Sequence, residues 1–278
     1  MGEYIPYAGT NAIIEVAVGI QFQHNISEAD LSNARMVYES DLQNEFAQIQ
    51  EIFGTELHME NTDQGGFRIE KTKGHYPAGF KILSVDSEGE INRTLTISKD
   101  RLVLHFTRYC GWAATLDDSI RYISILLTNM NLANNGIESF GLRYIDRFTY
   151  DSEKDDANTA LLFNQPSDFI SNKCFDAGPY WHCDSGWFEN YNCHSILNQL
   201  GIGRAMVDSA PTVTINHEMI FCLSALVNTV GIFMEDAGGK YSGLRNSLDY
   251  LHILNRKVMT GLLNQDILNQ IGIHDEYV

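Results

Sequence analysis

The residues best suited to chemistry are two arginines and an aspartate in one segment, Arg143, Asp146 and Arg147. Strict alternation over 138–150 predicts a strand, on which both arginines lie on one face, about 13 Å apart. Asp146 then falls on the opposite, apolar face, where an ionised carboxylate needs a hydrogen-bond or ion-pair partner. One interpretation is an anion or partner site that uses Arg143 and Arg147. The alternative is a structural salt-bridge network that ties this strand to a helix.

A second candidate is a set of soft ligands in an aromatic-rich stretch: Cys174, His182, Cys183, Cys193 and His194. Structural zinc sites usually draw on close pairs of ligands with two to four residues between them. Both pairs here are adjacent residues, which point to opposite faces of a strand, so at most one of each pair could readily reach a common metal. We therefore expect core cysteines and no metal site. A hydrolase or metal-dependent enzyme that uses 174–194 is the alternative.

The remaining catalytic motifs are incomplete. His217-Glu218 begins like a zincin motif but lacks the second histidine and lies in a strand pattern. Gly201 and Gly203 are two glycines of a dinucleotide fingerprint without the third. His105 lies on a predicted strand and is interpreted as a hydrogen-bonded sheet residue. The sequence thus predicts no catalytic residue and no cofactor, and it argues against an enzyme.

Strands and helices must position these residues. Alternation over 14–22 predicts a first strand, in which Gly19 marks a bulge or a close approach of backbones. Ser27 begins a capping box, and an apolar stripe predicts a helix from there to Phe53, stopped by Gly54. Further short strands are predicted at 56–61, 66–72, 79–86, 91–98 and 102–108.

A second helix is predicted after Thr115 as its cap and before the stop signal at 134–136. Trp112 either anchors this helix or contributes to a ligand or partner site. In the second half, a closing helix is predicted over 242–263, preceded by strands at 166–171, 178–188, 193–207, 212–221 and 224–235. The pattern predicts an α+β fold, with antiparallel sheets packed by long amphipathic helices. Its halves, 1–150 and 151–278, form either two similar units or one continuous domain.

Composition limits the partners. The 278 residues are 44% hydrophobic, enough for a large core, and carry a formal net charge of −17. Nucleic-acid binding requires lysine and arginine to neutralise phosphates, so this acidity argues against it and against an anionic membrane surface. The charge favours solubility or a basic protein partner.

Other features predict a cytoplasmic chain. No apolar run reaches the length of a membrane helix, and the first residues have neither a basic nor an apolar export region. Five cysteines at irregular spacing indicate reduced thiols. A homodimer is expected because symmetric pairs are the commonest oligomers.

Four stretches together resemble a sporadically distributed prokaryotic family of unknown function, whose hallmark is Leu-Arg-Tyr-Ile-Asn-Arg. The segment 142–147 is similar to the hallmark, with Asp146 in place of the asparagine. The opening strand 12–22 and the Tyr-x-Gly-Trp pattern at 109–112 are similar too, as is 248–252 in the closing helix. The resemblance implies no established activity. The family's scattered distribution suggests genes that travel with mobile or antiviral defence modules, and hence a binding or regulatory protein that acts through protein contacts.

Overall fold

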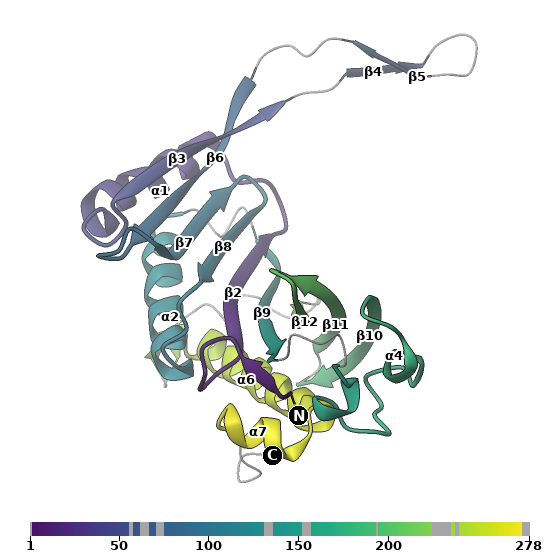
Figure 1. Ribbon diagram of the computed structural model, residues 1–278. Coiled ribbons are helices and arrows are strands. Elements are labelled where there is room, and N and C mark those ends of the chain that lie inside the picture. Colours follow the sequence, from purple (N-terminus) through teal and green to yellow (C-terminus); the bar gives the residue numbers. More distant parts are fainter. Residues whose placement is uncertain are drawn as a thin grey trace.

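One antiparallel sheet dominates the computed structural model (Figure 1), which describes residues 2–55, 58–61, 67–70, 75–130, 136–151, 157–192, 194–223, 235–236 and 239–273. Its strands follow the order β10-β11-β12-β9-β2-β8-β7-β6-β3, and β1 pairs with β9. The strands are β1 Tyr4–Pro6, β2 Ile13–Phe22, β3 Gln48–Thr55, β6 His75–Val85, β7 Ile91–Ser98, β8 Arg101–Phe106, β9 Ile137–Tyr150, β10 Trp181–Tyr191, β11 His194–Val207 and β12 Ala210–Cys222. The α+β prediction is confirmed. Two small hairpins join β4 His58–Asn61 to β5 Phe67–Glu70 and β13 Glu235–Asp236 to β14 Gly239–Lys240.

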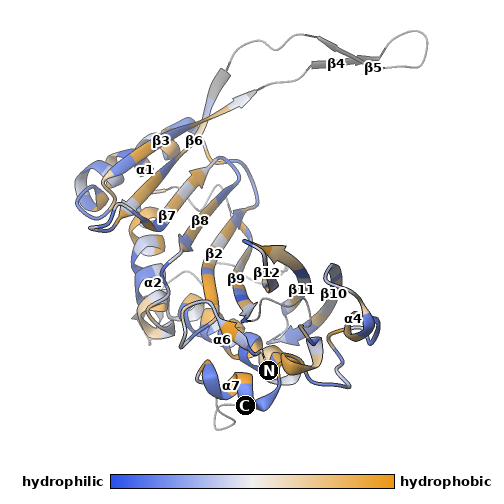
Figure 2. Cartoon of the chain, in the orientation of Figure 1, coloured by the Kyte–Doolittle hydropathy of each residue, from blue (hydrophilic) through white to orange (hydrophobic). Residues whose placement is uncertain are grey.

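The three longest helices lie on one face of the sheet, the covered face (Figure 1). The helical elements are α1 Glu28–Val37, η1 Tyr38–Leu42, α2 Trp112–Thr128, η2 Thr159–Leu161, α4 Lys173–Asp176, α6 Ser242–Leu262 and α7 Gln265–Gln270. Apolar and polar residues alternate along the central strands (Figure 2), so one set of side chains packs under the helices and the other faces away. Among the described residues, no helix combines the length and apolar composition needed to cross a bilayer.

The first helix begins as predicted and ends earlier. The Ser27 hydroxyl oxygen accepts a hydrogen bond from the Asp30 backbone N–H, and the Asp30 carboxylate accepts one from the Ser27 backbone N–H. These two bonds complete the capping box. The helix does not run to Phe53, because α1 ends at Val37 and 48–55 forms β3 against β6. The spacing of the apolar residues fits either a helical stripe or a strand, as Ile49, Ile52 and Phe53 show. These residues form a strand because they pair with β6.

The second helix starts earlier than predicted. Gly111, with φ 106°, precedes the first turn, and Trp112 is the first helical residue. A positive φ favours glycine, which explains why the chain turns here rather than at Thr115. The Thr115 hydroxyl lies within the helix and donates to the Gly111 carbonyl at 3.0 Å.

The second half differs from prediction before β10. The predicted strand at 166–171 is absent from the described residues, since this stretch joins the short helices η2 and α4. The predicted strand at 224–235 lies outside the described residues except for Glu235. The closing helix α6 lies where it was predicted. Because β9 pairs with both β2 and β12, a single sheet runs through 1–150 and 151–278.

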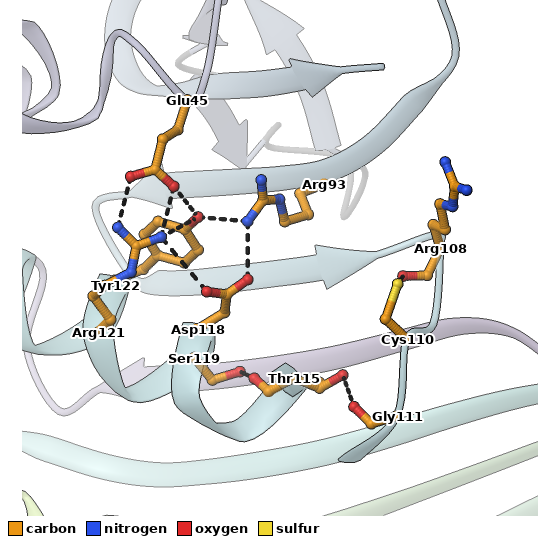
Figure 3. A network of polar contacts seen from close by, with 10 residues as sticks. All are labelled: Glu45, Arg93, Arg108, Cys110, Gly111, Thr115, Asp118, Ser119, Arg121 and Tyr122. Atoms are coloured by element: carbon orange, nitrogen blue, oxygen red, sulfur yellow. Dashed lines mark hydrogen bonds and ion pairs between the residues drawn. The ribbon is translucent and has the colours of Figure 1, made fainter. Parts of the chain in front are cut away.

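A polar network attaches α2 to the sheet and to the loop after η1 (Figure 3). Arg121 donates two hydrogen bonds of 2.6 Å to Glu45, which also accepts from the Tyr122 hydroxyl at 2.6 Å. Arg93 of β7 donates to Asp118 at 2.9 Å and to Tyr122 at 2.7 Å. The hydrogen bond from Arg121 holds the pKa of Glu45 at about 2. The network fixes the helix that contributes Trp112.

Replacing Glu45 by alanine is expected to lower the free energy of unfolding by about 1–3 kcal/mol, because Arg121 and the Tyr122 hydroxyl lose their acceptor. Urea denaturation measures this change. Glu39→Ala is the matched control, since Glu39 pairs with Arg35 at 3.5 Å but is 58% exposed, and such pairs contribute about 0.5 kcal/mol or less. Equal losses in the two variants would contradict a structural role for the network.

Candidate functional site

The face of the sheet opposite the helices, called the open face, carries one continuous row of side chains. Phe140, Leu142 and Tyr144 of β9 are buried under the helices, so Gly141 lies on the open face. Cross-strand pairing extends the row over nine strands: Phe188, Leu197, Ile220, Gly141, Gly19, Val103, Thr96, Lys81 and Gln50. The row is apolar on β10 to β12, where Phe188 is 68% exposed. It has no side chains at the two central glycines.

The central groove is a hollow of about 310 Å³ over those glycines. Gly19 and Gly141 form its floor, and Ala17, Val103 and Ile220 also line it. A Cβ atom at Gly19 would meet nothing closer than 3.9 Å, so the predicted bulge or close approach does not occur there. The close approach is at Gly141, where a Cβ would lie 2.9 Å from the Met219 carbonyl oxygen of β12.

Three charged or titratable side chains meet at one end of the groove. Glu15 of β2 accepts a hydrogen bond from Arg143 of β9, and His105 Nδ1 of β8 lies 3.1 Å from the same carboxylate oxygen. Cross-strand register explains this, because Arg143 and His105 both pair with Ala17, two residues from Glu15. The hydrogen bonds from His105 and Arg143 hold the pKa of Glu15 at about 2. The carboxylate is therefore ionised and His105 Nδ1 carries the proton.

Two further charged groups line the groove. Glu218 of β12 pairs in register with Arg143. Arg101, at the other end, donates to Asp100 from Nε at 3.0 Å and from Nη2 at 2.7 Å. Both arginines of the groove are therefore engaged by carboxylates of this chain.

Arg143 and Arg147 share the open face, as the alternation predicts, but they do not form a free pair. Arg143 is bound to Glu15. The Arg147 guanidinium lies 5.8 Å from the centre of the Tyr7 ring. The ion pair of Arg143 joins β9 to β2, so it links strand to strand rather than strand to helix.

Asp146 lies on the covered face, 4% exposed. Burial alone raises its pKa to about 7. The expected ion pair with an arginine is not seen within the described part of the chain, where neither Arg143 nor Arg147 reaches this side of the sheet. Asp146 is therefore remote from the groove and does not act with the two arginines.

Trp112 belongs to a partly buried polar cluster between the helices and the sheet. Its indole Nε1 donates to Asp249 of α6 at 2.6 Å, and its ring stacks on His252 at 4.5 Å. His252 Nδ1 lies 2.8 Å from the Tyr144 hydroxyl. Burial and the charge of Arg256 lower the pKa of His252 to about 4, so its ring is neutral. Three of the motif stretches meet here, and Trp112 connects α2 to α6.

No protein-family model and no curated protein matches this chain. The family resemblance therefore stays a prediction. The convergence of residues from 109–112, 142–147 and 248–252 in one cluster gives the motifs a common physical setting, which is the contact of α2, α6 and β9.

The cysteine and histidine set is divided by the fold. Cys174 of α4 is buried and contacts Cys183 of β10. His182 is exposed on the opposite face of β10, while His194 lies at the far end of the hairpin, opposite Tyr191. Cys193 lies outside the described residues. No cluster of three metal-ligating side chains occurs among the residues described.

Sequence reasoning assigned no site to Glu15, His105 or Glu218, which lie in or next to the groove. The alternation of polar and apolar residues places each of them on the face of its strand opposite the apolar one. This alternation is the feature of the sequence that could have indicated them. The pairing of β2 with both β8 and β9 brings Glu15, His105 and Arg143 together, and no local pattern encodes that order.

Proposed function

We propose that this chain is a cytoplasmic binding or regulatory protein that contacts a protein partner through the open face of its sheet. The row from Phe188 to the central groove carries this proposal. Sheet faces without a covering layer are normally polar, whereas this one has neighbouring apolar side chains, Phe188, Leu197 and Ile220, that lead to a floor without side chains. A partner that packs on them would remove apolar surface from water.

The net charge of −17 supports a basic partner and disfavours nucleic acid. We also propose membership of the sporadically distributed prokaryotic family, with a role in a mobile or antiviral defence module. Its support is the resemblance of the motif stretches.

The strand order supports a further element of the proposal, two similar halves. β2 pairs with β8 before α2, and β9 pairs with β12 before α6. In 13–128 and again in 137–262, a strand thus pairs with a later strand and a helix follows, with β9 itself lying inside the half 1–150. These two stretches meet at the β2–β9 pair, where Gly19 lies opposite Gly141, so the groove forms at their junction.

Filling the groove is expected to abolish partner binding without unfolding the chain. Gly19→Leu places a side chain on the open face, where its Cβ has only ordinary contacts. Gly203→Leu is the matched control, because Gly203 lies on the same face of β11, outside the groove lining, and its Cβ also has ordinary contacts. Affinity purification of tagged wild type and both variants from the native host, followed by binding measurements with the purified partner, tests this.

We expect the partner to bind wild type and Gly203→Leu equally and Gly19→Leu at least about tenfold more weakly. Unchanged binding by Gly19→Leu would contradict the proposed surface. Recovery of a metabolite or metal, with no protein, would contradict the proposed class of function.

A further inference from the structure

Charge compensation in the central groove is incomplete. Arg143 is paired with Glu15, and Arg101 is paired with Asp100. Glu218 also lines the groove and is half-buried, yet within the described chain it has no ion pair. Of the charged or titratable side chains that line the groove, Glu218 is thus the one without an ion pair among the described residues. A partly buried carboxylate without an ion pair favours a cationic ligand.

Hydrogen-bond capacity points the same way. His105 donates from Nδ1 to Glu15, and no described residue forms a hydrogen bond with its Nε2. The Glu218 carboxylate accepts only. The Glu218 carboxylate therefore has spare acceptor capacity among the described residues, which favours a ligand with N–H donors.

The floor suits an unbranched aliphatic stem. Gly19 and Gly141 provide no side chains, Ile220 and Val103 provide apolar walls, and Gly141 is the diagonal neighbour of Glu218 across the β9–β12 pair. Long cationic side chains bury their methylene groups against apolar surface and keep the charged group at a polar partner.

We infer that the central groove receives one cationic side chain, of arginine or lysine, from the protein partner, with the cation paired to Glu218 and the stem over Gly19 and Gly141. This inference rests on the proposed function, because it names the group with which the partner enters the open face. It agrees with the basic partner that the overall charge favours.

The test uses backbone-amide NMR shifts of the full chain, titrated with the amides of acetyl-arginine and acetyl-lysine as probes. The acetyl-citrulline amide is the neutral control, and the acetyl-glutamate amide is the anionic control. We expect the cationic probes alone to shift amides within 17–21 and 139–143. In Glu218→Gln the affinity should fall about tenfold, the loss of one charge-assisted contact. Asp184→Asn is the matched control, since Asp184 is an exposed carboxylate on the same face outside the groove lining.

Any of three results would overturn the inference: no shifts in these segments, equal shifts with citrulline, or an unchanged affinity of Glu218→Gln. Shifts caused by the glutamate probe alone would assign the groove to an anion. Binding of the purified partner separates this inference from the proposed function. Suppose that the partner fails to bind Gly19→Leu but binds Glu218→Gln as tightly as wild type. The open face would then still be the binding surface, but the inference of a cationic side chain paired to Glu218 would be wrong.

Discussion

Asp146→Asn is expected to stabilise the folded chain above about pH 7, by up to about 4 kcal/mol. The carboxyl group is 4% exposed, and burial raises its pKa from 3.8 to about 7. The folded state therefore holds this proton more tightly than the unfolded state does. The contribution of the Asp146 carboxyl group to the free energy of unfolding is fully present below about pH 3.8. It is lost as the pH rises to about 7. Asparagine does not titrate, so it avoids that loss.

Urea denaturation of both proteins at several pH values between about 4 and 8 measures the effect. The difference between Asp146→Asn and wild type should grow with pH and level off above about pH 7. Asp117→Asn is the control, because Asp117 is 67% exposed and its replacement should give no such slope. A constant difference across the range would show that the Asp146 carboxyl titrates normally. The result also bears on the proposed resemblance, since the hallmark of that family has asparagine where this chain has Asp146.

The parts of the fold that could be predicted from sequence are those set by local patterns. The alternation of β9 and the stripe of α6 each bury one face, and a shift of register would expose that face. The capping box at Ser27 is also local, because both hydrogen bonds join residues three apart. The end of α1 could not be predicted, because residues 48–55 satisfy both periods and only their pairing with β6 selects the strand.

The candidate site was predictable only in part. Alternation places Arg143 on one face of β9 and Asp146 on the other, and the structure agrees. Nothing local indicates that Arg143 meets Glu15, which is 128 residues away in the sequence. Those two residues meet because β2 lies between β8 and β9, an order that depends on the packing of the whole sheet. The same order turns Gly19 and Gly141 into one bare floor.

The two faces of β9 therefore have different roles. The covered face carries Tyr144, which joins Trp112 and His252 in the contact of α2 with α6. The open face carries Arg143 and Gly141, which belong to the groove. A motif with alternating arginine and tyrosine thus serves packing and binding at once, and substitutions within it should separate into losses of stability and losses of binding.

Glu15→Gln is expected to lower the free energy of unfolding by about 3 kcal/mol at neutral pH, since it leaves the half-buried Arg143 guanidinium without its carboxylate. The side chain of Glu15 is 23% exposed, and its hydrogen bonds lower its pKa from 4.5 to about 2. A depressed pKa means that the unfolded state binds the proton more tightly. The stabilisation is thus complete above about pH 4.5 and is lost as the pH falls to about 2, the opposite direction from Asp146.

Denaturation of wild type and Glu15→Gln at several pH values measures this dependence. The difference should shrink as the pH falls below about 4.5 and should disappear near pH 2. Glu218→Gln is the matched control, because Glu218 lines the same groove without an ion pair among the described residues, and its stability should change by about 0.5 kcal/mol or less. Equal losses for both variants would mean that Glu15 and Arg143 contribute no more than an isolated surface charge. A loss confined to Glu15→Gln would establish that the ion pair holds β2 against β9, which leaves Glu218 as the groove carboxylate available to a partner.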